Sequence, residues 1–285
     1  MDVYSTVTQS IIDAIEADPG QLTTPWHRSA AGIPLNATTG STYNGVNILS
    51  LWASSAIHGH TSSEWASYRQ WQETGAQVQK GAKSTVIVFY KPLPEKEGED
   101  RRFVLKYSRV FNASQVEGYV PPDIPVGEPV ERLEAADRAI VATGIKVTEK
   151  GDRACYMLQS DEVYIPDDWR FFDTPTSSRQ EAFYSTIFHE LTHATSHKSR
   201  LDRKLGAKFG DPAYAYEELV AELGAAFCCA RLGITNKPRL DHAQYLKSWL
   251  RALKNETRFI FKASADAQKA TDWLLSRQEA KLAAE

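Results

Sequence analysis

A proline-rich stretch near the middle of the chain limits its possible folds more than any other feature. Residues 118–129 read GYVPPDIPVGEP and carry four prolines. Proline lacks a backbone N–H and fixes φ, so this stretch can continue neither a helix nor a central strand. It predicts a linker over residues 121–129. The flanking segments, residues 1–120 and 130–285, are each long enough to bury a core, so we expect two domains.

The N-terminal segment predicts a small α+β domain. Val7, Ile11 and Ile15 recur at helical spacing near the start of the chain. Two later runs rich in β-branched and aromatic residues predict the two strands of a hairpin. The expected elements are helices over residues 3–17, 47–59 and 64–75, the last capped by Ser63, and strands over residues 85–90 and 101–111.

The C-terminal segment changes from helical to strand periodicity and back, which again indicates an α+β fold class. We expect Ser177 or Ser178 to cap the helix that begins there. The expected elements are a helix over residues 129–144, short strands over 145–149, 154–158 and 161–166, and helices over 177–197, 216–233, 239–260 and 264–283.

The segment HELTH at residues 189–193 carries the most specific chemical signal in the chain. His189 and His193 lie one turn apart on one face of the expected helix, so both imidazoles can reach one metal ion. Zn²⁺ lowers the pKa of a bound water toward 7, and Glu190 is the residue expected to take the proton of that water. The alternative is a packed helix with two surface histidines.

A catalytic zinc site needs a third protein ligand. Positions 196 and 199 are serines, which argues against a third histidine in that register. Glu217, Glu218 and Glu222 lie close together in an otherwise apolar helical segment. We assign Glu218 as the ligand and Glu222 as the carboxylate that orients one histidine, with the swapped assignment left open. Glu217 is expected to be solvated at the start of its helix.

Two imidazoles and a carboxylate suit Zn²⁺, and Mn²⁺ or another divalent ion could occupy the same ligands in a crystal. Peptide hydrolysis also needs a group for the oxyanion and a surface for the substrate backbone. The sequence does not choose among the nearby candidates for the oxyanion, which are Tyr214, Tyr216, His197 and Arg200. The strand over residues 161–166 is expected to be an edge that pairs with an extended peptide.

The N-terminal segment combines aromatic and basic residues. Four of the seven tryptophans lie there, and residues 22–92 carry five basic and two acidic side chains. Single-stranded DNA is held by aromatic stacking and a positive groove, so the composition permits such binding. The alternative is tryptophans in a core and a solvated basic face. The candidate DNA contacts are Trp26, Arg28, Tyr43, Asn44, Asn47, Lys80 and Lys83.

Two blocks of sequence resemble the ArdC family of antirestriction proteins from conjugative plasmids. The first block runs from PWHR and GIPLNATTGSTYNGVNILSLW to SRVFNASQVEG, and the second contains FHELTHATSHKSRLDR and YAYEELVAELGAAF. The first is similar to the single-stranded-DNA-binding domain of the family. The second is similar to its zincin-like metallopeptidase domain, which is related to the SprT-like and polyvalent-protein peptidases. Related Glu-zincins use a Glu ligand with an acidic residue four positions later, which supports Glu218.

The resemblance implies protection of incoming conjugative DNA from restriction. Its implied partners are single-stranded DNA and an unidentified protein substrate or restriction-system component. Three hypotheses stay open: a zinc endopeptidase joined to a DNA-binding module, a DNA-coating protein whose metal site is structural or not needed, and a housekeeping protease with no DNA role. Three cysteines, no apolar run of 18 residues and no recognisable signal peptide favour the bacterial cytoplasm and no membrane.

Overall fold

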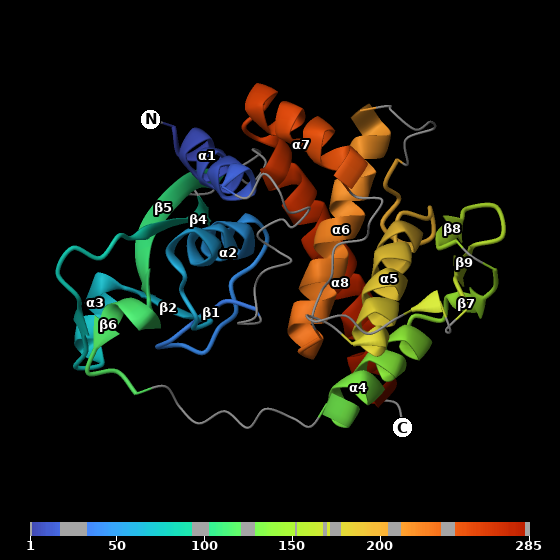
Figure 1. The fold of residues 1–285 in the computed structure, drawn as a ribbon, viewed down its shortest axis with the longest axis horizontal. Coiled ribbons are helices and arrows are strands. Elements are labelled where there is room, and N and C mark those ends of the chain that lie inside the picture. The colour runs from blue at the N-terminus through green and yellow to red at the C-terminus, as the bar shows by residue number, and fades with distance from the viewer. Residues whose placement is uncertain are drawn as a thin grey trace, which may run out of the picture.

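The structure is a computed structural model. It describes residues 2–17, 33–92, 103–120, 129–151, 153–167, 170–171, 178–204, 212–234 and 243–282. The expected linker lies outside the described residues except for Pro129, which begins a helix. In Figure 1 a sheet with its helices occupies one side of the molecule, and a group of long helices occupies the other.

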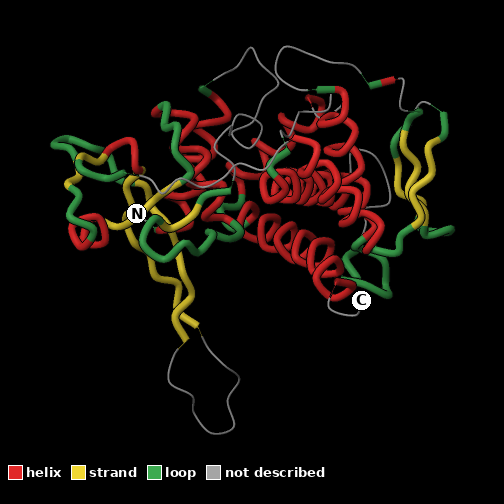
Figure 2. The backbone as a smooth tube through the Cα atoms, turned by 90° about the horizontal axis from the view of Figure 1, so that it is seen from below, coloured by secondary structure: helices red, strands yellow, loops and turns green. Residues whose placement is uncertain are grey.

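A four-stranded sheet organises the N-terminal half, in the order β1-β2-β5-β4. Its central feature is the β4–β5 hairpin, antiparallel from the pair Thr85 and Val110 to the pair Pro92 and Phe103, which confirms the expected hairpin. The hairpin projects from the body of the molecule (Figure 2). The strands are β1 (Leu35–Asn36), β2 (Glu64–Ser67), β4 (Thr85–Pro92) and β5 (Phe103–Asn112), and β3 (Gln77–Val78) and β6 (Val116–Glu117) form a second small sheet.

The helix expected over residues 64–75 begins four residues late. Its first residues form β2, where Trp65 and Ala66 pair with β5, and α3 (Tyr68–Glu73) follows. Ser67, not Ser63, is the cap. Its side chain accepts a hydrogen bond from the backbone N–H of Gln70, whose side chain accepts one from the N–H of Ser67. Pairing with a distant strand therefore overrides the local helical pattern.

Two helices cover this sheet, as expected: α1 (Val3–Glu16) and α2 (Val46–His58). α2 lies along the free edge of β4. The Asn47 side-chain amide donates to the carbonyl of Val88 at 2.8 Å and accepts from its N–H at 2.8 Å, and the Ser50 hydroxyl donates to the carbonyl of Val86 at 2.7 Å. Side chains of α2 thus bond edge groups that a further strand would otherwise pair with.

The C-terminal half contains a three-stranded sheet and five helices among the residues described. The strands are β7 (Lys146–Glu149), β8 (Cys155–Met157) and β9 (Glu162–Ile165). The helices are α4 (Pro129–Ala142), α5 (Arg179–Ala194), α6 (Pro212–Leu232), α7 (Ala243–Asn255) and α8 (Phe259–Leu282). α6 packs against both α5 and α8 (Figure 1). No described helix is long and apolar enough to span a membrane.

The strand expected as an exposed edge is the central strand of its sheet, so that expectation is wrong. The order is β7-β9-β8, with β7 parallel and β8 antiparallel to β9. Val163 and Ile165 of β9 are fully buried, as a central strand requires. The edges of the described sheet are β7 and β8.

The largest hydrophobic cluster joins the two halves of the chain. It contains Ile11 of α1 and Trp52 of α2 together with Phe227 of α6 and Trp249 of α7. The rings of Trp52 and Phe227 lie with their centroids 6.0 Å apart. The division into domains of residues 1–120 and 130–285 stays a prediction, and the two halves share a core.

We expect Phe227→Ala to lower the free energy of unfolding by about 3–5 kcal/mol, because it empties a fully buried site at this junction. Urea unfolding followed by circular dichroism measures the effect. Val141→Ala, at an exposed position on α4, is the control and should change stability by less than about 0.5 kcal/mol. Equal effects of the two variants would contradict the prediction.

Candidate metal centre

Helices α5 and α6 approach closely enough to share one group of side chains. α5 begins at a capping box in which the Ser178 side chain accepts from Glu181 N–H and the Glu181 carboxylate accepts from Ser178 N–H. Of the two serines expected as caps, Ser178 is therefore the one that caps α5. Farther along, Gly224 of α6 faces Thr192 of α5, and a Cβ added at Gly224 would lie 2.6 Å from the Thr192 side chain. Glycine is required for this approach.

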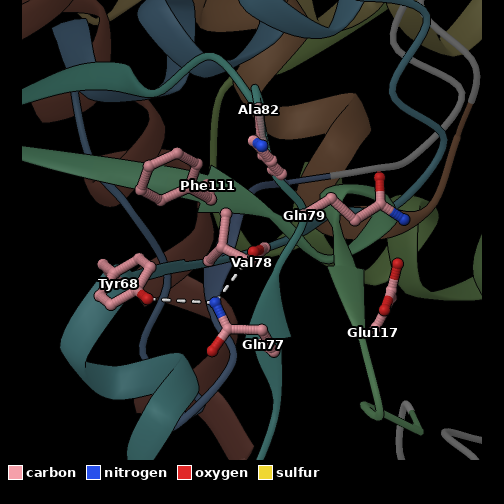
Figure 3. Close-up of a pocket in the computed structure, with 8 residues that line it drawn as sticks. Tyr68, Gln77, Val78, Gln79, Ala82, Phe111 and Glu117 are labelled. Carbon is pink, nitrogen blue, oxygen red and sulfur yellow. Dashed lines mark hydrogen bonds between the residues drawn. The ribbon is translucent and has the colours of Figure 1, made fainter.

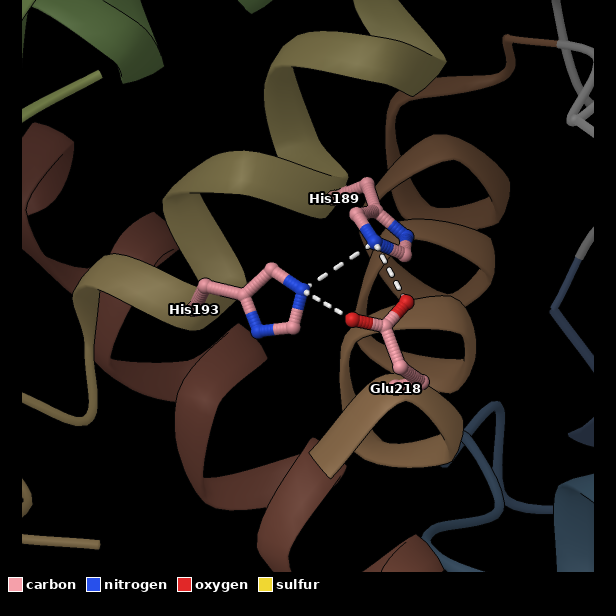
Figure 4. A group of neighbouring side chains, drawn as sticks. All are labelled: His189, His193 and Glu218. Carbon is pink, nitrogen blue, oxygen red and sulfur yellow. Dashed lines mark hydrogen bonds and ion pairs between the residues drawn. The ribbon is translucent and has the colours of Figure 1, made fainter. Parts of the chain in front are cut away.

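Three side chains from these helices converge on one point (Figure 4). The Nε2 atoms of His189 and His193 lie 3.2 Å apart. The two oxygens of Glu218 lie 3.7 Å from His189 Nε2 and 3.6 Å from His193 Nε2. Figure 4 shows both imidazoles reaching from α5 toward the carboxylate on α6. All three ligand atoms lie within 4.8 Å of one another.

The spacing of these atoms fits a metal ion. Ligand atoms about 2.1 Å from a tetrahedral ion lie about 3.4 Å from one another, close to the three distances in this cluster. The donor set is two neutral imidazole nitrogens and a carboxylate, which suits a divalent transition metal. The residues present therefore fit one divalent ion between α5 and α6.

Electrostatics at the cluster favour a positive charge. Burial lowers the pKa of His193, but the carboxylates of Glu217, Glu218 and Glu190 outweigh burial and raise it. Burial raises the pKa of Glu218, but His189 and His193 reverse this effect and hold it at about 2. The surrounding carboxylates thus favour a positive charge at His193. A metal cation at the same point would take the place of that charge.

Each histidine has its own supporting carboxylate. Glu222 Oε2 lies 3.6 Å from Nδ1 of His189, and Glu217 Oε1 lies 3.5 Å from Nδ1 of His193. Nδ1 is on the opposite side of the ring from the converging Nε2 atoms, so this geometry favours Glu218 over Glu222 as the ligand. Such carboxylates fix the tautomer and orientation of ligating histidines. The ligand assignment itself stays a prediction.

The expectation that Glu217 is solvated is wrong, because this residue is only 3% exposed. Arg203 offsets its charge: Nη2 donates to Glu217 Oε1 at 2.6 Å and Nε donates to Oε2 at 3.2 Å. The same guanidinium donates to Thr192 O at 2.8 Å and to Thr195 Oγ1 at 2.7 Å. Arg203 therefore ties the end of α5 to α6. No sequence pattern singled it out.

Glu190 lies inside the same buried region. It is 3% exposed, and its charge contributes both to the raised pKa of His193 and, after burial, to the raised pKa of the Cys155 thiol. Cys155 belongs to β8, so the edge strand β8 borders the cluster on the side of Glu190. The expected general base is therefore near both the converging ligands and an open strand edge.

Of the four candidates for oxyanion binding, three have partners away from the cluster. Tyr216 donates to Asp266 Oδ2 of α8 at 2.9 Å, Arg200 forms an ion pair with Asp161, and His197 Nδ1 lies 2.7 Å from Ser199 Oγ. The fourth, Tyr214, hydrogen-bonds to Glu218, and this bond helps to lower the pKa of Glu218. Tyr214 is thus the candidate that contacts the cluster.

The candidate DNA contacts fall into different environments. Trp26 and Arg28 lie outside the described residues. Tyr43 is half-buried, and its hydroxyl donates to Trp65 O at 3.4 Å. Both polar atoms of the Asn47 side chain are bonded to Val88, which gives Asn47 a structural role. Asn44, Lys80 and Lys83 are exposed.

The described tryptophans of the N-terminal half belong to its core. Trp52, Trp65 and Trp71 are each at most 3% exposed. The alternative of core tryptophans is therefore confirmed for these three. Exposed aromatic side chains occur instead on α3 and on the β4–β5 hairpin, the segment that the sequence already offered as a sheet surface for a strand. They are Tyr68, Phe89, Tyr90, Phe103 and Tyr107.

The chain is similar to known protein families and solved structures over almost its whole length. Residues 1–127 match the model of the N-terminal domain of the anti-restriction factor ArdC, and residues 134–266 match the zincin-like metallopeptidase model. The chain is 36% identical to the antirestriction ArdC protein from plasmid R388 in both a metal-free and a Mn(II)-bound crystal structure. Both comparisons give a TM-score of 0.77 and cover 98% of this chain. They cover 99% of the metal-free chain and 98% of the Mn(II)-bound chain. The chain belongs to the ArdC family of antirestriction proteins.

Other relatives are similar in sequence to most of this chain. An uncharacterized protein, y4eC, of Sinorhizobium fredii is 39% identical over 97% of this chain and 92% of its own length. Two proteins of Escherichia coli, both named DNA primase TraC, are 33% identical over 97% of this chain but only 27% and 20% of their own lengths. The region matched by this chain thus makes up nearly all of y4eC but about a quarter or less of each TraC protein.

We expect Gly224→Ala to destabilise this ArdC-family chain by about 1–3 kcal/mol and to weaken metal binding, because the added methyl overlaps Thr192. Thr192 cannot turn away easily, since it is β-branched and its hydroxyl donates to Phe188 O. Thermal unfolding and metal titration measure both effects. The double variant Gly224→Ala/Thr192→Ala should recover part of the lost stability and metal affinity. If the effects of the two single substitutions were strictly additive, the proposed overlap of the two side chains would be wrong.

We expect Glu217→Gln to weaken metal binding about 10- to 100-fold, because a neutral amide no longer holds His193 in its ligating tautomer. Competition with a chelator for Zn²⁺ or Mn²⁺ measures the affinity. Glu134→Gln, at an exposed carboxylate on α4, is the matched control and should leave it unchanged. If Glu217→Gln bound the metal as tightly as the wild type, Glu217 would have no role in the metal centre.

Proposed function

We propose that this chain protects incoming conjugative DNA from restriction by combining a zinc endopeptidase with single-stranded-DNA binding. One observation carries the peptidase: the convergence of His189, His193 and Glu218, with Glu190 beside them on α5. A closed structural site would need four protein ligands, often cysteines. Among the described residues the converging group has three members, none of them cysteine. An open fourth position is what a hydrolytic site needs.

His189, His193 and Glu218 would hold the zinc ion, which supplies Lewis acidity and an acidified water when bound. Glu190 takes the proton of the attacking water and later returns it to the leaving amine. Glu222 and Glu217 keep the two imidazoles oriented. Tyr214, whose hydroxyl bonds the Glu218 carboxylate, would turn its single O–H from that carboxylate to the oxyanion. β8 offers its free edge to an extended substrate backbone beside Glu190.

The DNA-binding part of the proposal rests on the family and on the surface of the N-terminal half. The N-terminal domain of ArdC matches residues 1–127, and this segment exposes aromatic rings and lysines, Lys80 and Lys83 among them. Stacking and positive charge together suit single strands. The protein acts in the cytoplasm of the recipient or host bacterium, where it meets incoming DNA and the components of a restriction system.

We expect Glu190→Gln to retain zinc and fold but to lower peptidase activity about 10²- to 10⁴-fold, because Gln is near-isosteric and cannot accept the proton. The assay uses the full chain loaded with zinc and purified restriction-system components as substrates. Zinc content, thermal unfolding and binding to single-stranded DNA should match the wild type. Glu134→Gln is the control for loss of one carboxylate.

Two outcomes would overturn parts of this proposal. Loss of zinc from Glu190→Gln would show that the assigned ligand set is wrong. Full protection by Glu190→Gln in a conjugation assay into a restricting recipient would show that proteolysis is not needed for antirestriction. The DNA-coating alternative would then replace the peptidase as the basis of protection.

A further inference from the structure

We propose that single-stranded DNA binds along the open face of β5, from Tyr107 through Arg109 to the pocket beside Phe111. This inference rests on the proposed binding of single strands and names its surface. The three residues alternate along β5, so their side chains lie on one face of the sheet. Tyr107 is 56% exposed, Arg109 is exposed and Phe111 is half-buried. They span about 13 Å of the strand.

The register of the hairpin explains why this face is open over β5. Val88 of β4 pairs with Tyr107 and lies on the same face, yet it is only 5% exposed and belongs to the core formed with α1 and α2. Val86 pairs with Arg109 and packs against the same core. The helices therefore cover the β4 side of this face and Leu105 of β5, and they leave Tyr107 and Arg109 accessible.

A pocket of about 580 Å³ continues this face at Phe111 (Figure 3). The ring centroids of Tyr68 and Phe111 lie 6.4 Å apart along one wall. Gln77 fixes Tyr68, since its Nε2 donates to the Tyr68 hydroxyl at 3.1 Å and to Val78 O at 3.0 Å. Gln79 supplies a further amide to the pocket lining. The volume lies in the range of small-ligand sites and accommodates a nucleobase with its sugar.

The charges on this surface match a nucleic acid strand. Arg109, two residues before Phe111 on β5, and Lys80, which lines the same pocket as Phe111, are exposed cations in the proposed path. Arg109 donates to Ser84 Oγ at 3.1 Å, which uses one of the five donors of its guanidinium. Glu117, the acidic residue in the pocket lining, lies across from Tyr68 (Figure 3). It disfavours phosphate there, so the base, not the backbone, enters the pocket.

Single-stranded DNA fits this arrangement better than duplex. Exposed rings accept unstacked bases, and every base has a face that can stack. In a duplex the base faces are already occupied, and only the phosphates would meet Arg109 and Lys80. We therefore expect the surface to bind single strands of mixed sequence. Bases would stack on Tyr107 and Tyr68, and the two cations would contact phosphates.

The opposite face of the same hairpin provides a matched control. Phe89 and Lys106 pair directly across the two strands, and both are exposed, with Phe89 at 47%. They offer the same combination of ring and cation as Tyr107 and Arg109 but point the other way. Substitutions there test whether binding follows the face or only the composition.

The experiment measures fluorescence anisotropy of a labelled 20-nucleotide oligo(dT) with the full chain across a salt series. We expect Tyr107→Ala to weaken binding about 5- to 100-fold, the effect of losing one stacked base. Arg109→Ala should lower the slope of log affinity against log salt by about 0.7, the value for one phosphate contact on a single strand. Phe89→Ala and Lys106→Ala should match the wild type, and circular dichroism should show unchanged folding in all four.

The outcomes separate this inference from the proposed function. In one outcome the wild type binds oligo(dT), and Tyr107→Ala and Arg109→Ala bind it as tightly as the two control variants do. The surface proposed on β5 is then wrong, and DNA binds to another surface of the protein. If the wild type binds no single strand at any salt, both the surface and the proposed DNA binding fall. If duplex DNA binds as tightly and is weakened equally by Tyr107→Ala, the choice of single strands is overturned.

Discussion

The approach of α5 to α6 at Thr192 and Gly224 is the constraint on which the metal centre depends. Thr192 precedes His193 on α5, and Gly224 lies six residues beyond Glu218 on α6. Two helices that pack through large side chains have their axes 8–10 Å apart. The absence of a side chain at Gly224 brings these two close enough for one carboxylate to meet two imidazoles. One backbone position thus controls the distances from Glu218 to both imidazoles.

The centre buries much more negative than positive charge. Glu190, Glu217, Glu218 and Glu222 are each at most 9% exposed, and Arg203 is bonded to one of them. Buried charges are costly unless they are paired or coordinate a metal. Arg203 balances part of this charge through Glu217. A divalent ion bound between His189, His193 and Glu218 would balance more of it.

Sequence reasoning succeeded where the chemistry is local and failed where partners are distant in the chain. The Ser178 cap and the HELTH segment depend on neighbours within four residues, and the structure places His189 and His193 with Nε2 atoms 3.2 Å apart. The expected Ser63 cap is wrong because residues 65–67 pair with the distant strand β5. Trp65 was expected in a helix because its pairing with Asn112 of β5 leaves no local signal. Arg203 bonds Thr192, 11 residues earlier, and Glu217, 14 later, with no repeating pattern. Glu217 was misjudged because its burial depends on that arginine.

The hydrophobic core shared by α1, α2, α6 and α7 has a consequence for how the two activities would cooperate. Since Trp52 and Phe227 pack in one cluster, the N-terminal sheet cannot swing on a tether relative to the helices that carry Glu190 and His193. A strand held on β5 would therefore lie at a set offset from the peptidase centre. The distance and orientation between such a strand and the His189, His193 and Glu218 cluster would then be a property of the folded chain and not of a flexible linker.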